Sequence, residues 1–590
     1  MPQLTEIYGL DIRSLALFRV CLALILLVDI RIRLNDLWAF YSDWGVLPRV
    51  ALIENVINPF KLSFHLANGF GLFQGFLMVL AFVIALALLV GYRTRLATVL
   101  SWLFLYSLQS RNPVIVQGGD SLIRISLFWA IFLPLGAAYS LDRALDPSGK
   151  EPPQKIFSGA SVALFAQVMM VYWFTAAMKN GPDWILDRTA IYYALNLELF
   201  ERPFGQYLLN FPHRLEWLTW LVLWFERLGP FLLVTPVFVG LVRTIGVFLF
   251  VLLHVGMGSA MRVGPFPLIG ITTALVFLPS DFWNWILPQL WPRASDGLKI
   301  FYDGDCGFCK KSVLILRAFF LRPDTPVLPA QSSPEIEREM LKRNSWVTRD
   351  SGNKNHYKFD AFLAICRASP LLRPFSRVLG LPLLRFLGTQ VYETIAGHRA
   401  GTARIFPLPS FRPMKTETPR WADRLAVILI VYVLIWNLSG MGYFMIPKPL
   451  RVPAWVLGLD QGWGMFAPTL DHDGGWHIFY ARLRDGSEVD LFRGGRPIDW
   501  KKPSDPSNLY KNERWRKYMT NINHAEKAEM RPYLADYLCL KWNRRQKDPV
   551  KKIERVEIYF MKEPTPPVGL ADPPPKKVLL WGQDCPSCCR

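Results

Sequence analysis

Two cysteines are separated by two residues in "FYDGDCGFCKK", residues 301–311. The glycines and aspartates around Cys306 predict a tight turn, and apolar residues from Phe308 onward recur at helical spacing. Cys306 and Cys309 are therefore expected at the N-terminus of a helix that follows the short strand "LKIFY". The helix dipole and free amides would stabilise a thiolate on Cys306, and the spacing allows Cys309 to close a disulfide with it. We predict a redox-active thiol pair.

Two other uses of these cysteines must be weighed. A structural zinc site needs a second pair of ligands, whereas the other candidates between residues 295 and 410, namely Cys366, His356 and His398, have no paired spacing. No metal site is expected on this basis. A purely structural disulfide is disfavoured if the segment is cytoplasmic. Asp303 either shuttles protons for the second thiol or shapes the turn, and Asp305 is interpreted as a helix cap.

The elements around this motif are those of a membrane protein with soluble parts. The chain has 590 residues, of which 52% are hydrophobic, and a formal net charge of +20. Many basic residues flank apolar runs, which favours contact with membrane lipids over nucleic-acid binding. The first apolar segment carries Arg19 and Asp29 and has no small-residue cleavage site, so it is predicted to be a retained membrane helix and not a signal peptide.

Eight candidate membrane helices precede the cysteine pair and a ninth follows it. Basic residues gather in the loops after the second, fourth and sixth candidates, so these loops and the N-terminus are placed in the cytoplasm. The thiol pair is then cytoplasmic and the C-terminal region extracytoplasmic; a count that differs by one before residue 282 would invert the placement of the thiols. The candidates are 14–33, 70–91, 96–109, 120–139, 158–178, 216–239, 243–260, 264–281 and 425–446.

Several ionisable residues lie within these apolar segments. Charge in hydrocarbon is costly, so each is expected to face the bundle interior or a wet cavity and to find a partner. They indicate either a polar site within the bundle or interhelical pairing and snorkelling near helix ends. The residues are Arg19, Asp29, Asp120, Arg124, Glu226 and Arg227.

The membrane region resembles the HTTM family, whose best-known member is the vitamin K-dependent gamma-glutamyl carboxylase. The resemblance rests on "SLALFRVCLALILLVD", "FYSDWGVLPR", "RNPVIVQGGDSLIRISLFW", "VYWFTAAMKNGPDW" and "HVGMGSAMRVGPFPL" and covers about residues 8–290. It implies that Lys179 matches a base that activates a reduced quinone, with Trp184 and His254 beside the cofactor. Lys179 could instead be an interfacial anchor. No histidine follows Asn112, where the carboxylase has an Asn-His pair, which puts carboxylation in doubt.

The segment 298–405 resembles the DCC-type thiol-disulfide oxidoreductases. Asp303, Cys306 and Cys309 match their D-x-x-C-x-x-C signature. Further on, "VLPAQSS" with Gln331 resembles the second strand, and "SWVTRDSGNKNHYKFDAFLAI" resembles a strand, turn, strand and helix. The resemblance implies a compact α/β thioredoxin-like domain.

The C-terminal region is expected to form a small α+β domain over 450–565, followed by a Pro/Cys-rich tail over 566–590. "WHIFYARL" and "SEVDLFR" flank a turn and predict a hairpin, and "IERVEIYFMKE" predicts a strand. "GWGMFAP" and "RWRKY" resemble the soluble tail of bacterial HTTM proteins. Cys585, Cys588 and Cys589 near the end could form a second redox pair, a metal-binding tail or an undefined end.

The expected fold is thus a polytopic α-helical membrane bundle of about eight plus one helices, with an inserted thioredoxin-like domain and a C-terminal α+β domain, in a bacterial inner or plasma membrane. The expected function is thiol-disulfide exchange with a protein or small-molecule substrate, coupled to a quinone-like partner in the bundle. Two alternatives remain: a carboxylase-like enzyme that uses Lys179 as a base, and a membrane scaffold in which the thiols only sense redox state.

Overall fold

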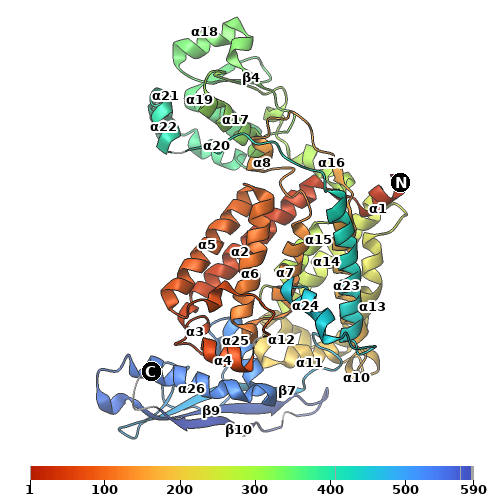
Figure 1. Cartoon of the computed structure of the whole chain (residues 1–590), viewed down its shortest axis with the longest axis vertical. Helices are drawn as coiled ribbons and strands as arrows, with labels where there is room; N and C mark the ends of the chain where they lie inside the picture. The colour runs from red at the N-terminus through yellow and green to blue at the C-terminus, as the bar shows by residue number, and fades with distance from the viewer. Residues whose placement is uncertain (1, 57, 406, 572, 586–590) are drawn as a thin grey trace.

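The computed structural model describes residues 2–56, 58–405, 407–571 and 573–585. A bundle of helices forms its centre, with a small α/β domain at one end and the C-terminal domain at the other (Figure 1). The N-terminus lies at the end of the bundle that carries the α/β domain. This arrangement agrees with the expected crossing by the ninth apolar segment, because that segment connects the two ends.

The bundle contains a helix at each of the nine predicted segments. The long ones are α2 (Ile12–Leu34), α5 (Gly71–Val90), α6 (Thr94–Arg111), α7 (Gly118–Ala130), α9 (Gly159–Met178), α13 (Pro212–Leu228), α14 (Val239–Ala260), α15 (Phe266–Leu275) and α23 (Arg420–Gly440). Shorter helices connect them: α1 (Pro2–Tyr8), α3 (Leu37–Phe40), α4 (Arg49–Asn55), α8 (Leu141–Ala144), α10 (Pro182–Ile185), α11 (Ala190–Asn196), α12 (Pro203–Leu209) and α16 (Ser280–Leu290).

Four of the described helices are long and apolar enough to cross a membrane: α5, α9, α14 and α23. The pair α15 and α16 passes the same test together but is bent by 97°, so it is either a broken span or a re-entrant segment. The other predicted spans are too short or too polar to meet the same test. α7 has only 13 residues, and α2 carries several arginines and Asp29. The protein is an integral membrane protein, and the expected number of crossings stays a prediction.

Buried carboxylates in the bundle have arginine partners, as expected for charge in an apolar setting. Arg33 of α2 donates to Asp29 Oδ2 at 2.7 Å and to Asp120 Oδ1 at 2.6 Å. Arg514, from the C-terminal domain, donates to Asp29 Oδ1 at 2.7 Å and to Asp120 Oδ1 at 2.8 Å. Two arginines and two carboxylates therefore join α2, α7 and the C-terminal domain in one buried network.

The two other buried arginines of the predicted set are satisfied mainly by backbone oxygens. Arg19 donates to the carbonyl of Leu135 at 2.8 Å, and Arg124 donates to the carbonyl of Gly458 at 2.9 Å. Arg227 is half-buried, with its guanidinium 5.2 Å from the ring centre of Trp224 on its own helix. These residues hold segments together and line no common site.

The α/β domain has a four-stranded sheet in the order β4-β3-β5-β6. β3 is parallel to β4, and β5 is antiparallel to β3 and β6. The expected strands and helices are present, with the thiol helix α17 directly after β3. The elements are β3 (Lys299–Tyr302), α17 (Gly307–Phe320), β4 (Val327–Pro329), α18 (Pro334–Arg343), β5 (Val347–Arg349), β6 (Asn355–Tyr357), α19 (Lys358–Ala368), α20 (Arg373–Leu379), α21 (Pro382–Gly397) and α22 (Arg399–Ile405).

The C-terminal domain has a sheet in the order β10-β9-β7-β8, packed on helices α25 (Glu513–Asn523) and α26 (Arg531–Asn543). The predicted hairpin is confirmed as β7 (Asp473–Leu483) and β8 (Glu488–Asp490), and the predicted strand as β9 (Ile553–Pro564). The segment 566–590 was expected to be a tail outside the domain, but part of it belongs to the sheet, because β10 (Lys576–Asp584) pairs antiparallel with β9. The proline-rich segment before residue 576 connects β9 to β10 and does not prevent β10 from forming.

The C-terminal domain also begins later in the sequence than residue 450, where it was expected to start. α24 (Lys448–Val456) and the segment after it lie in the bundle, where Leu459 and Trp463 are fully buried in its apolar core. The chain therefore returns into the membrane region after α23 before it reaches β7. The segment "GLDQGWGMFAP", which follows α24, has no helical period from which this return could be predicted.

Candidate functional site

The thiol pair has the predicted local geometry. Cys306 is the N-cap residue of α17, and its Sγ accepts the Cys309 N–H at 3.2 Å. The two residues form a disulfide, with Cα atoms 5.3 Å apart. Both cysteines are half-exposed, so a substrate thiol or disulfide can approach the sulfurs from solvent. A disulfide at an accessible helix N-terminus is the arrangement of a thiol-exchange centre.

Asp303 holds the turn before Cys306. Its Oδ1 accepts the Asp305 N–H at 3.2 Å, and its carbonyl accepts the Cys306 N–H at 3.1 Å. Its Oδ2 is 3.0 Å from Nη1 of Arg399 at the start of α22. Gln331 completes the turn, because its Oε1 accepts the Gly304 N–H at 3.0 Å. The carboxylate is thus fixed by the turn and by a cation from a distant helix.

Cys366 is the other cysteine of this domain, and it is isolated from the pair. It is buried in α19 and has no disulfide partner. Burial raises the pKa of its thiol to about 11, so it stays protonated and unreactive near neutral pH. Among the described residues, no group of three or more histidine, cysteine or acidic side chains could hold a metal ion.

Lys179, the second predicted site residue, is buried at the end of α9. Its Nζ lies 2.7 Å from both carboxylate oxygens of Glu226 on α13. The side chains of both residues are only 6% exposed. The indole of Trp184 covers the amine, with its ring centre 4.4 Å from Nζ. Lys179 therefore does not extend into solvent. The expectation that Trp184 lies beside a cofactor stays a prediction.

A cavity of about 480 Å³ joins Lys179 to His254. His254 Nε2 is 2.9 Å from the hydroxyl of Tyr172, and both residues line the cavity together with Glu226. Trp184 is not part of the lining; its Nε1 donates to the carbonyl of Phe466 at 2.8 Å. The cavity combines a buried ion pair, a phenol and an imidazole with apolar walls, which suits a small, mainly apolar molecule with a few polar groups.

The C-terminal domain supplies lining residues that were not predicted from the sequence. Arg516, Lys517 and Thr520 of α25 reach the cavity, and Met465 lies on the segment that returns through the bundle. Burial, and secondly the neighbouring Arg516, lowers the pKa of Lys517. Arg516 and Lys517 belong to the basic and aromatic run "RWRKY". The HTTM resemblance includes this run but assigns it no role.

The thiol pair and the Lys179 cavity lie at opposite ends of the bundle. α17 stands with the α/β domain at one end, whereas the cavity is closed by α25 at the other (Figure 1). Among the residues that the structure describes, none therefore contacts both centres.

Comparison with protein families assigns two regions of the chain. Residues 9–283 match the model of the HTTM domain, and residues 300–404 match the model of the DCC1-like thiol-disulfide oxidoreductase. The chain joins an HTTM domain to a DCC1-like domain. A search of curated proteins and a search of solved structures gave no match. The DCC1-like domain contains the disulfide of Cys306 and Cys309, and the HTTM domain contains Lys179 and His254.

A second disulfide lies outside both matched domains. Cys539 of α26 forms a disulfide with Cys585, across 46 residues of sequence and with Cα atoms 5.9 Å apart. Cys585 was noted in the sequence as part of a terminal cluster, but its partner was not predicted. Cys588 and Cys589 lie outside the described residues. The bond ties the end of the chain to α26 and so has the position of a structural disulfide.

Proposed function

We propose that the protein is a membrane-bound oxidoreductase that exchanges a dithiol for a disulfide at Cys306 and Cys309. The observation that carries this proposal is the half-exposed disulfide at the N-terminus of α17. In the reduced enzyme, the Cys306 thiolate attacks a substrate disulfide and releases one substrate thiol. Cys309 then attacks Sγ of Cys306, releases the second thiol and leaves the enzyme oxidised. Two electrons and two protons pass to the substrate, which is a protein or a small molecule.

Asp303 acts in this proposal as a positioning residue. Its contacts hold the turn that presents Cys306 and leave its carboxylate paired with Arg399. The alternative for Asp303 is the proton role that the sequence left open, in which its carboxylate serves the second thiol.

The exchange activity is tested with Cys309→Ser and Cys306→Ser in the full chain. Cys309→Ser should accumulate a mixed disulfide between Cys306 and substrate, visible on non-reducing gels, whereas Cys306→Ser should form none. Cys366→Ser is the matched control and should exchange at the parent rate. If Cys306→Ser reduces a model disulfide as fast as the parent, the proposed activity is wrong. If the pair cycles with redox buffer but reduces no substrate, the thiols serve as a sensor on a scaffold.

We also propose that the DCC1-like domain is cytoplasmic and the C-terminal domain extracytoplasmic. Basic loop residues such as Arg93, Arg95 and Lys150 lie toward the first domain, which supports the cytoplasmic side by the positive-inside rule. The disulfide of Cys539 and Cys585 supports an oxidising compartment for the other.

A second function is proposed for the cavity at Lys179, on a separate observation. Two residues of its lining have buried side-chain nitrogens without a hydrogen-bond partner among the described residues: His254 Nδ1 and Gln117 Nε2. Such groups are costly unless a ligand or water satisfies them. Their chemistry fits the carbonyl or hydroxyl oxygens of a quinone, as the HTTM resemblance implies. When bound, a quinone would supply two-electron redox chemistry.

The roles of the protein groups in this second function follow from their contacts. Glu226 holds the amine of Lys179, and Lys179 could act as a base only after its proton passes to Glu226 or to another acceptor. His254 and Tyr172 share a hydrogen bond that fixes the imidazole against the cavity wall. Since the cavity and the thiols are at opposite ends of the bundle, coupling between them requires a carrier that diffuses through the bilayer. A lipid-soluble quinone has that property.

The second function is tested by lipid extraction and by quinone turnover. A quinone should co-purify with the parent, and both Lys179→Arg and Lys179→Ala should abolish its oxidation or oxygenation, because arginine stays protonated and alanine has no amine. Thiol exchange by Cys306 and Cys309 should continue at the parent rate in both variants. Turnover of quinone by both variants at the parent rate would eliminate the base role. Formation of carboxylated glutamate by the parent would select the carboxylase-like alternative.

A further inference from the structure

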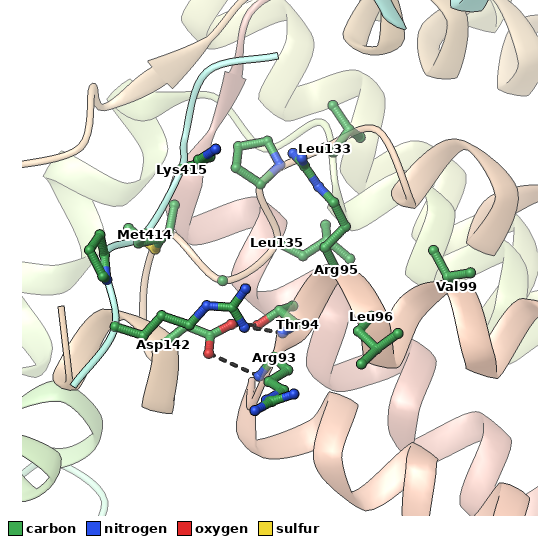
Figure 2. A pocket seen from close by; sticks show the side chains of 15 residues that line it. Arg93, Thr94, Arg95, Leu96, Val99, Leu133, Leu135, Asp142, Met414 and Lys415 are labelled. Carbon is green, nitrogen blue, oxygen red and sulfur yellow. Dashed lines mark hydrogen bonds between the residues drawn. The ribbon is translucent and has the colours of Figure 1, made fainter. Parts of the chain in front are cut away.

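A second hollow, of about 640 Å³, lies at the end of the bundle that carries the DCC1-like domain. Its walls come from the start of α6, the loop after α7, the helix α8 and the linker that leads from the DCC1-like domain to α23. Figure 2 shows side chains from these segments around the hollow. It is separate from both the thiol pair and the Lys179 cavity, since it shares no lining residue with either.

Four cationic residues line this hollow: Arg93, Arg95, Arg412 and Lys415. Within the described part of the chain, none of their side chains forms an ion pair with a carboxylate. Cations of one sign in a hollow raise the local positive potential and attract an anion. Two of these residues come from the start of α6, and the other two come from a linker more than 300 residues later in the sequence. The positive charge of the hollow is therefore not the result of a single basic run.

The one carboxylate of the lining does not neutralise them. Asp142 accepts the backbone N–H of Arg93 at 2.9 Å and that of Thr94 at 2.7 Å, and the Thr94 hydroxyl at 2.6 Å. These bonds, shown as dashed lines in Figure 2 for the two backbone donors, cap the start of α6. The Asp142 carboxylate is therefore held by the N-terminus of α6, and it also interacts electrostatically with the buried Arg19.

The hollow also has an apolar side. Leu96, Val99, Leu133 and Met414 line it together with the cations, and Leu96 is 49% exposed on the outer face of α6. The cationic residues Arg93 and Arg95 and the apolar residues Leu96 and Val99 follow each other at the start of α6. A free phosphate would use only the cations, whereas a phospholipid would place its phosphate among them and an acyl chain along Leu96.

The linker wall is fixed in place. The Arg412 N–H donates to the carbonyl of Leu145 at 3.0 Å, and the Met414 N–H lies 3.4 Å from Asp146 Oδ1. The preceding residue, Phe411, packs its ring against the ammonium groups of Lys310 and Lys311, 5.4 and 5.5 Å away. These lysines directly follow Cys309 in the sequence, so the linker touches the thiol helix on one side and lines the hollow on the other.

We propose that this hollow binds the phosphate head group of an anionic phospholipid at the boundary of the membrane. The unpaired cations provide the attraction, and basic pockets between membrane helices are known to select anionic head groups on the cytoplasmic side. The apolar wall holds the start of an acyl chain. The bound lipid joins α6 to the linker and so holds the linker beside α17.

The test uses the full chain in detergent micelles with native mass spectrometry. Phosphatidylglycerol and phosphatidylcholine of identical acyl chains are titrated separately onto the parent, onto Arg95→Gln/Lys415→Gln and onto Lys150→Gln/Lys354→Gln. The last variant removes the same charge from exposed positions outside the hollow. We expect the first variant to bind phosphatidylglycerol about thirtyfold more weakly, the loss expected when two basic residues near an anionic head group are removed. The control variant should bind it as the parent does, and phosphatidylcholine binding should not differ among the three.

Competition with inorganic phosphate distinguishes the two sources of the anion. Millimolar phosphate should leave the bound phosphatidylglycerol in place, because it lacks the apolar contact. Displacement by phosphate at that concentration would show a site for a soluble anion and would overturn the lipid assignment. Equal phosphatidylglycerol binding by the parent and Arg95→Gln/Lys415→Gln would overturn the site itself. The elution profile and circular dichroism of each variant verify that the fold is intact.

Discussion

The ammonium of Lys179 is equidistant from the two carboxylate oxygens of Glu226, at 2.7 Å from each, and both side chains are buried in the bundle. Each of these two side chains is the ion-pair partner of the other, and both are withdrawn from solvent. Loss of one partner leaves an uncompensated buried charge, whereas loss of both leaves an apolar contact.

The first prediction follows from this pair. Lys179→Met and Glu226→Leu should each lower the free energy of unfolding by about 3–5 kcal/mol, and the double variant should recover most of that loss. Thermal unfolding of the full chain in micelles measures all three proteins. If the double variant instead loses the sum of the two single-variant losses, the two side chains do not stabilise each other.

The second prediction concerns the support of the thiol turn. Arg399→Gln removes the cation that holds Asp303, and we expect thiol exchange to slow about two- to fivefold, as for loss of a partly exposed ion pair. Stopped-flow reduction of a model disulfide gives the rate. Arg385→Gln is the matched control, because Arg385 pairs with Asp360, an exposed carboxylate at the start of α19. A slower rate in the control alone would contradict the positioning role of Asp303.

The third prediction concerns the disulfide of Cys539 and Cys585. Cys539→Ser should destabilise the C-terminal domain by about 2–4 kcal/mol, because the bond closes a long loop in the unfolded chain. Reductant should destabilise the parent similarly and leave the variant unchanged. Limited proteolysis at rising temperature follows the domain, and Cys366→Ser should behave as the parent. A parent that is insensitive to reductant would show that the bond contributes nothing to stability.

The fourth prediction concerns sidedness. Reporter fusions near Ser351 and near Gly569 should report opposite sides of the membrane, the first cytoplasmic and the second extracytoplasmic. The two positions belong to the domains at opposite ends of the bundle. Equal signals would show that α23 does not cross, and reversed signals would show an error of one in the number of crossings before residue 282.

Much of this arrangement could be predicted from the sequence where local patterns decide it. Cys306 and Cys309 lie between a short apolar strand and an amphipathic helix, so their place at a helix N-terminus follows from spacing alone. Lys179 could be singled out only through a resemblance, because a lysine after an apolar helix has no local feature that separates a base from an interfacial anchor. Its partner Glu226 was noted only as a charge that needed a partner.

The features that escaped prediction depend on contacts between distant segments. The pairing of Cys539 with Cys585 could not be deduced, since spacing does not determine disulfide connectivity. β10 follows a proline-rich run, and its pairing with β9 is set by the sheet and not by its own pattern. Lys517 enters the cavity because α25 docks on the bundle, which no periodicity in "RWRKY" indicates.

The position of Arg514 has a consequence for the order in which the molecule is assembled. Asp29 and Asp120 are synthesised and inserted with a single internal cation, Arg33, so the nascent bundle carries one uncompensated negative charge. Within this network, that charge is neutralised only when Arg514 has been translated and contacts Asp29 of α2 and Asp120 of α7. The bundle therefore acquires its final electrostatic balance late in biosynthesis, and a chain that stops before α25 leaves Asp29 and Asp120 with Arg33 as the one cation of this network.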